Sequence, residues 1–168
     1  MGIRLRPFRV EDESDARRAQ EELAADGHTF LSVLEASVSW SDCLRTLENY
    51  RHGVELPEGR VPATILATTV DRVLVGRISI CHDLNDFLAN FGGHIGYCVR
   101  PACRQRGFAS EMLRQGLVIA RAQGIDRVLV TCDENNLPSA RVIERNGGVL
   151  EDVRTDPNGQ PTRRYWID

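Results

Sequence analysis

Lysine is missing from this chain of 168 residues, and all 21 of its basic residues are arginine. The chain therefore offers no lysine side chain of its own for modification. Basic charge is not in excess either, because 24 acidic residues bring the formal net charge to -3. Domains that bind nucleic acid usually carry a clear basic excess, so we expect no DNA or RNA partner.

Paired cysteines and long apolar runs are also missing. The five cysteines form no C-x-x-C motif, which argues against a zinc ribbon or a disulfide framework. No apolar run approaches the ~18 residues that span a bilayer. The first residues contain neither the apolar stretch of a secretory leader nor a myristoylation signal. We expect a cytoplasmic protein with no membrane partner and no metal, folded as one domain over residues 1–168.

Apolar periodicity predicts an alternation of strands and helices. The patterns indicate strands over residues 3–8, 62–70, 73–81, 92–99, 127–132, 149–154 and 162–167. They indicate helices over residues 11–26, 41–52, 85–90, 108–124 and 139–145, the second of them capped at Ser41 or Asp42. The run at 127–132 is typical of a central strand buried on both faces. Together these elements predict a mixed α/β sheet with helices on its faces.

Residues 92–113 are the most informative segment, because a strand there leads through an arginine-rich loop into the most regular helix of the chain. Free N–H groups and the helix dipole favour phosphate at such a helix N-terminus, and Gly107 allows a ligand to approach the backbone. The P-loop motif G-x-x-x-x-G-K-[ST] and a dinucleotide-binding G-x-G-x-x-G motif are both absent, which disfavours kinases and nicotinamide enzymes. The structural alternative is an ordinary turn with solvated arginines.

The order of these motifs resembles that of the GNAT family of N-acetyltransferases. The resemblance is carried by Val99-Arg100-Pro101, by the R-x-x-G-x-A loop over residues 104–109 and by Asn136 before a short helix. It implies a mixed, mostly antiparallel central sheet with helices on both faces and strands splayed at the acyl-CoA site. It also implies that the loop holds the pyrophosphate of acetyl-CoA, and that the N–H of Val99 or Arg100 polarises the thioester carbonyl. The cofactor-binding residues implied in this way are Val99, Arg100, Arg104, Gln105, Arg106, Gly107, Phe108, Ala109 and Asn136. For Asn136, an Asx turn is the structural alternative.

Transfer of an acetyl group to an amine needs a base, because only the neutral amine attacks a thioester. His94, where many family members carry glutamate, is the first candidate, and His82, next to an aspartate, is the second. Each could instead be a hydrogen-bonded histidine at the end of a strand. The resemblance places the family's tyrosine acid at Ile143, which leaves Ser139, Cys132 or water to protonate the leaving thiolate, or no acid at all, since a thiolate with a pKa of ~8.5 is a tolerable leaving group.

The remaining expectations concern the core residues, the reaction and the oligomeric state. Tyr97 and the five cysteines are interpreted as core residues. We expect an acetyltransferase that acts on a small-molecule or peptide amine, and the alternative is an acyl-CoA-binding regulatory module without activity. A hydroxyl acceptor or a longer acyl group is a further alternative. The final hairpin, over residues 149–167, could pair with a second copy to form a homodimer.

Overall fold

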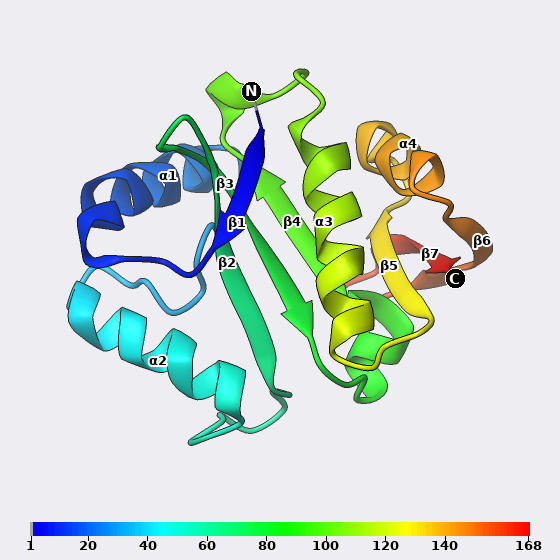
Figure 1. Ribbon diagram of the computed structural model, residues 1–168. Helices are drawn as coiled ribbons and strands as arrows, with labels where there is room; N and C mark the ends of the chain where they lie inside the picture. The colour runs from blue at the N-terminus through cyan, green and yellow to red at the C-terminus, as the bar shows by residue number, and fades with distance from the viewer. Residues whose placement is uncertain (1) are drawn as a thin grey trace.

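Two antiparallel sheets form the centre of the molecule. The computed structural model describes residues 2–168, and its first sheet has the strand order β1-β2-β3-β4. The second sheet has the order β5-β7-β6, and within residues 2–168 no strand ladder joins β4 to the neighbouring β5 (Figure 1). The strands are β1 (Ile3–Arg6), β2 (Ala63–Val70), β3 (Val73–Cys81), β4 (Ile95–Val99), β5 (Val128–Asp133), β6 (Val149–Thr155) and β7 (Pro161–Ile167).

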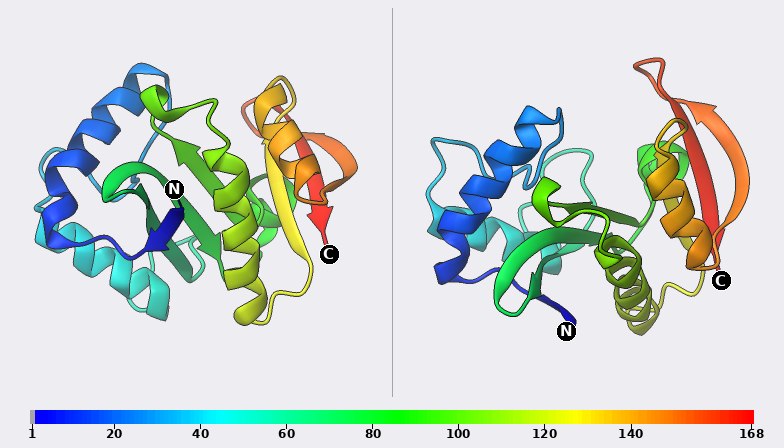
Figure 2. Two further views of the ribbon diagram at one scale, coloured as in Figure 1. Left: turned by 45° about the horizontal axis from the view of Figure 1, so that its top comes forward. Right: turned by 90° about the horizontal axis from the view of Figure 1, so that it is seen from above.

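The α-helices cover both faces of the first sheet. Helices α1 (Glu13–Ala25) and α2 (Trp40–His52) lie on one face, and α3 (Phe108–Ala122) lies on the other (Figure 2). Helix α4 (Leu137–Arg145) packs beside β5 and α3. Each face has its own apolar core, one around Met112 and Leu117 of α3 and the other around Leu23 and Trp40. Burial of these side chains is the main force that fixes the helices on the sheet.

The predicted fold class is confirmed, because every strand pair is antiparallel and helices lie on both faces. The predicted hairpin is also present as β2 and β3. Strand β5 is correctly predicted to be buried, but by hydrogen bonding it is the edge of its sheet rather than a central strand. No helix in the described part of the chain has both the length and the apolarity to cross a membrane.

Two boundaries differ from the sequence patterns for local reasons. Helix α2 begins at Trp40, because the side chain of Ser39 accepts a hydrogen bond from the Asp42 N–H at 3.2 Å; the expected cap at Ser41 or Asp42 is therefore wrong. The short helix expected over residues 85–90 continues as a π-helical turn, η2 (Leu88–Gly92), which shortens the following strand to Ile95–Val99.

Candidate active site

The gap between β4 and β5 is closed at one end by His94 and Leu129. The His94 N–H donates to the Leu129 carbonyl oxygen at 2.7 Å, and the Leu129 N–H donates to Nδ1 of His94 at 2.9 Å. A Cβ on Gly93 would lie 2.6 Å from that same carbonyl oxygen, so this close approach requires glycine. Towards Val99 the two strands share no ladder, which leaves their facing edges unpaired.

Strand β4 directs one of its last N–H groups into this gap. The Arg100 N–H donates to the Val75 carbonyl oxygen of β3 at 2.8 Å. Successive residues of an antiparallel strand turn their N–H groups to opposite edges, so the Val99 N–H faces β5. Of the two N–H groups considered from the sequence, only that of Val99 is free to polarise a carbonyl group in the gap.

The loop before α3 presents a run of backbone N–H groups without partners. Among residues 2–168, the amides of residues 105–110 find no acceptor, and the first helical bond runs from Glu111 to Gly107. Gln105 and Gly107 adopt left-handed conformations, with φ of 61° and 79°. Such a concave set of amides at the positive end of a helix is a binding site for an anion. A Cβ on Gly107 would meet no atom within 4 Å, so space for a ligand lies beside it.

The three arginines near this loop have different surroundings. The Arg100 guanidinium is buried and donates to both carboxylate oxygens of Glu22 in α1, at 2.7 and 2.9 Å. It ties the end of β4 to α1, so the side chain of Arg100, one of the cofactor-binding residues implied by the sequence, is engaged with Glu22 instead. Arg104 donates to the Val99 carbonyl oxygen and to Asp26, whereas the exposed side chain of Arg106 has no partner within residues 2–168. Arg106 is therefore the free cation of the loop.

The first turn of α4 lies across the gap from β4. Asn136 caps this helix by accepting a hydrogen bond from the Ser139 N–H at 3.3 Å, three residues further on, which is a helix N-cap rather than the Asx turn considered as the alternative. The Ser139 hydroxyl lies 2.8 Å from the phenol oxygen of Tyr97, which reaches over from β4. Burial raises the pKa of Tyr97 to about 12, so its hydroxyl stays protonated. Tyr97 is thus partly buried, as expected, but it also takes part in a polar contact that the sequence did not reveal.

His94 is buried, and its ring is engaged with the backbone. A nitrogen that accepts an N–H bond carries no proton, so neutral His94 holds its proton on Nε2. Burial lowers the pKa of His94, and the Asp83 carboxylate only partly offsets this effect. The free nitrogen is then a donor with no lone pair to take a proton, which argues against the expected general-base role.

His82 lies at the end of α3 that is remote from Gly107. Its Nε2 is 2.7 Å from Oγ1 of Thr64, which also receives a hydrogen bond from Gln123 at the C-terminus of α3. Gln123 is about 24 Å along the helix from Gly107, at 1.5 Å per residue. Burial lowers the pKa of His82. The structure therefore does not bring His82 together with the loop, and His82 has its own hydrogen-bond partner.

Cys132 and Cys43 are not activated nucleophiles. Cys132 lies at the end of β5, and burial raises the pKa of its thiol to about 11. Burial raises the pKa of Cys43 to about 11 as well. Thiols with raised pKa values carry little thiolate at neutral pH, which agrees with the structural interpretation. Among residues 2–168, no three His, Cys, Asp or Glu side chains gather closely enough to hold a metal ion.

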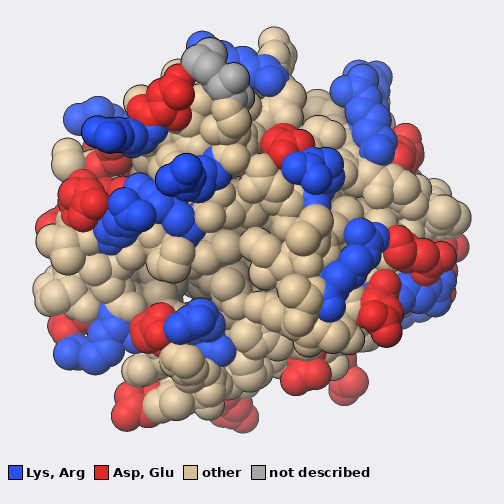
Figure 3. Space-filling model, in the orientation of Figure 1, with Lys and Arg blue, Asp and Glu red and all other residues tan. Residues whose placement is uncertain are grey.

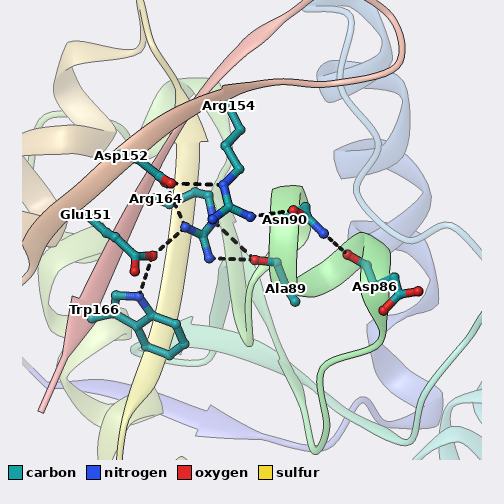
Figure 4. A network of polar contacts seen from close by, with 8 residues as sticks. All are labelled: Asp86, Ala89, Asn90, Glu151, Asp152, Arg154, Arg164 and Trp166. Carbon is teal, nitrogen blue, oxygen red and sulfur yellow. Dashed lines mark hydrogen bonds and ion pairs between the residues drawn. The ribbon is translucent and has the colours of Figure 1, made fainter.

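The hairpin of β6 and β7 holds η2 in place beside the closed end of the gap (Figure 4). The buried Arg164 donates to the Ala89 carbonyl oxygen at 2.7 Å and to Asp152 at 2.7 Å. Arg154 donates to the same aspartate at 2.9 Å and to the side-chain oxygen of Asn90. Sequence patterns could not reveal this network, because about 60–75 residues separate η2 from its arginine partners.

A cavity of about 700 Å³ lies elsewhere, between β1, the start of α1 and the turn of β2 and β3. Its arginines alternate with carboxylates, and Arg6 is bound to Asp12 at 2.7 Å. Basic and acidic side chains are likewise interspersed over the face shown in Figure 3. This cavity has no excess positive charge for an anion, so the free amides before α3 remain the better candidate for a ligand site.

Comparisons with known proteins identify a family and a shared fold. A family model described as an acetyltransferase (GNAT) domain matches residues 3–149. No curated protein matches the sequence. Among solved structures, Mycobacterium smegmatis RimJ in complex with CoA-disulfide is 21% identical, with a TM-score of 0.70 over 98% of this chain and 81% of that chain.

Two further structures share this fold. Microcin C7 self immunity acetyltransferase MccE, in complex with acetyl-CoA and AMP, is 17% identical, with a TM-score of 0.68 over 98% of this chain and 91% of that chain. The ribosomal L7/L12 alpha-N-protein acetyltransferase RimL is 17% identical, with a TM-score of 0.66 over 98% of this chain and 89% of that chain. At sequence identities this low, the structural similarity shows a common fold and nothing more specific.

Proposed function

The chain belongs to the acetyltransferase (GNAT) family, and on that basis we propose that it transfers an acetyl group from acetyl-CoA directly to an amine. One observation carries the proposal: the amides of residues 105–110, at the N-terminus of α3 and next to an unpaired strand edge, have no acceptor in the described part of the chain. An acyl-CoA molecule needs both features, because it carries a diphosphate at one end of its arm and a thioester at the other.

The residues around the loop fit a diphosphate. The amides of residues 105–110, including those of Phe108 and Ala109, would donate to its oxygens, and Arg106 would add a cation. Bound acetyl-CoA supplies an activated acetyl thioester. The Val99 N–H would donate to the thioester carbonyl oxygen, where negative charge grows as the amine attacks. Asn136, at the first turn of α4, is proposed as a further contact to the cofactor.

Proton transfers complete the reaction. The amine must lose a proton before it attacks, and we assign this step to water, because Nδ1 of His94 is occupied and His82 is bound to Thr64. The electron pair of the broken carbon–sulfur bond stays on sulfur. The Ser139 hydroxyl, supported by Tyr97, would pass a proton to this thiolate and regain one from the water that took the proton of the amine. A thiolate with a pKa near ~8.5 needs little help to leave, so the contribution of Ser139 is modest.

The acceptor is proposed as a class only. The names of similar structures mention a ribosomal protein for RimL and microcin C7 immunity for MccE. We therefore propose a protein N-terminus or a small-molecule amine, met in the cytoplasm, as the acceptor.

We also propose that the chain can form a homodimer. A second copy of the chain could pair with the free edge of β6, where Val149 and Leu150 are exposed.

Two measurements on the purified protein test this proposal. Calorimetry should detect CoA binding, and acetyl-CoA mixed with a panel of amines and N-terminal peptides should release free thiol over time. Binding without turnover on any amine would favour the alternative, a regulatory module that binds acyl-CoA. Release of thiol only with hydroxyl acceptors or only with longer acyl groups would change the reaction class. Absence of CoA binding would contradict both functions.

A further inference from the structure

His94 connects three strands at the closed end of the gap. Its carbonyl oxygen accepts a hydrogen bond from the Cys81 N–H of β3 at 2.7 Å, while its own N–H donates to the Leu129 carbonyl oxygen of β5 at 2.7 Å. Its ring accepts the Leu129 N–H at 2.9 Å. Both backbone groups of Leu129 are therefore satisfied by this one residue, at a buried position where an unpaired N–H would be costly.

Few hydrogen bonds determine the distance between β4 and β5, and the contact of Tyr97 with Ser139 reaches α4 rather than β5. No ladder follows the contact between His94 and Leu129, so the strands are free to separate from that point. The nearest additional link is the Thr131 hydroxyl, which donates to the Phe91 carbonyl oxygen of η2 at 2.6 Å. The hydrogen bond from the Leu129 N–H to the imidazole ring is therefore one of the few that fix the distance of β5 from the free Val99 N–H.

We propose that His94 is a positioning residue, which sets the width of the gap by binding the backbone of Leu129 through Nδ1. This inference rests on the proposed acetyl transfer, because its effect on rate arises from how the thioester is placed against the Val99 N–H. The diphosphate site at residues 105–110 lies at the other end of β4 and does not depend on this bond. Loss of the bond should therefore lower kcat more than it weakens binding of CoA.

Three substitutions separate a positioning role from a base. In His94→Asn, the side-chain oxygen takes the place of Nδ1 and can accept the Leu129 N–H. In His94→Gln, the polar atoms lie further out, near the place of Nε2, and in His94→Ala the acceptor is lost. We expect kcat to fall about 100-fold in the alanine and glutamine variants, the loss typical of a misplaced reactant, and to recover in the asparagine variant. The Kd for CoA should stay close to that of the wild type in all three.

A spectroscopic measurement tests the same inference independently of activity. In ¹⁵N-edited NMR spectra of the wild-type protein, Nδ1 of His94 should appear unprotonated and Nε2 protonated at pH 7. A proton on Nδ1, or an asparagine variant as slow as the alanine variant, would overturn the positioning role. If no amine is acetylated, the proposed function fails, and the tautomer still reports whether His94 holds Leu129.

Discussion

The two ends of the gap between β4 and β5 use their backbone groups in opposite ways. At the end near α3, the amides of residues 105–110 have no acceptor among residues 2–168. At the other end, His94 satisfies both backbone groups of Leu129, and Gly93 lets the strands come close. Free amides in an ordered loop are available to a ligand, whereas satisfied and buried amides make a fixed joint. From this comparison we expect binding and placement of the cofactor to be separable in this molecule.

The largest expected effect is at the ligand end. Gly107→Glu should weaken CoA binding by about 100-fold or more, because a carboxylate beside the diphosphate adds like charge in the space where the ligand lies. Calorimetric titration measures this loss. Gly107→Asn is the matched control, since asparagine tolerates the left-handed conformation without adding charge, and it should retain most of the affinity. Equal affinities for the glutamate variant and the wild type would contradict an anion site here.

The second prediction separates a structural arginine from one that binds ligand. Arg100→Met should lower the free energy of unfolding by about 2–3 kcal/mol, because it leaves the Glu22 carboxylate without its buried partner; the partial exposure of Glu22 reduces the usual penalty. Arg106→Met should leave this free energy unchanged and weaken CoA binding instead, most clearly at low salt. Chemical denaturation and calorimetry give the two quantities. An exchange of the two phenotypes would show that the arginines are wrongly assigned.

The third prediction concerns Thr68, an unpaired polar group that we do not assign to a ligand site. Its hydroxyl is buried with no hydrogen-bond partner among residues 2–168, and it lies in β2, which β3 separates from β4. Thr68→Val removes the buried hydroxyl and keeps the shape, so we expect it to raise the free energy of unfolding by about 1 kcal/mol. CoA affinity should not change. Destabilisation in urea titrations would contradict an unpaired hydroxyl at this position.

The smallest expected effect is on the pH dependence of stability that arises from His94. Burial lowers the pKa of His94 in the folded state below its ordinary value near ~6.5. The unfolded chain therefore binds a proton first, so this contribution to stability is complete above pH ~6.5 and is lost as the pH falls below it. His94→Asn, which cannot titrate, should lose less stability between pH 7.5 and 5.5 than the wild type. Parallel stability curves for the two proteins would contradict a buried, neutral His94.

Much of the fold could be predicted from the sequence, because the strongest signals are local. The stripe of apolar residues in α3, such as Met112 and Leu117, has a helical period, and the hairpin of β2 and β3 has a short turn between two β-branched runs. The start of α2 could not be predicted, since Ser39 and Ser41 are both suitable caps and only the backbone conformation selects between them. The π-helical turn η2 has no distinct sequence signal.

In the candidate site too, local features could be predicted from the sequence and contacts between distant residues could not. The loop around Gly107 was visible in the sequence, because its arginines, its glycine and the helix start are consecutive. The hydrogen-bond partners of the Arg100 and His94 side chains cannot be predicted in this way, because Glu22 is 78 residues and Leu129 35 residues away along the chain. A motif reports which residue types are present, but the hydrogen bonds of buried side chains are decided by tertiary packing.

The central claim is that the backbone amides of residues 105–110 bind the diphosphate of coenzyme A. The most direct measurement follows the backbone ¹H–¹⁵N resonances of the protein during titration with CoA and, separately, with pantetheine, which has no diphosphate. The account predicts large shifts of these amides with CoA and small ones with pantetheine. Shifts of equal size with both compounds, or shifts confined to other parts of the molecule, would contradict it.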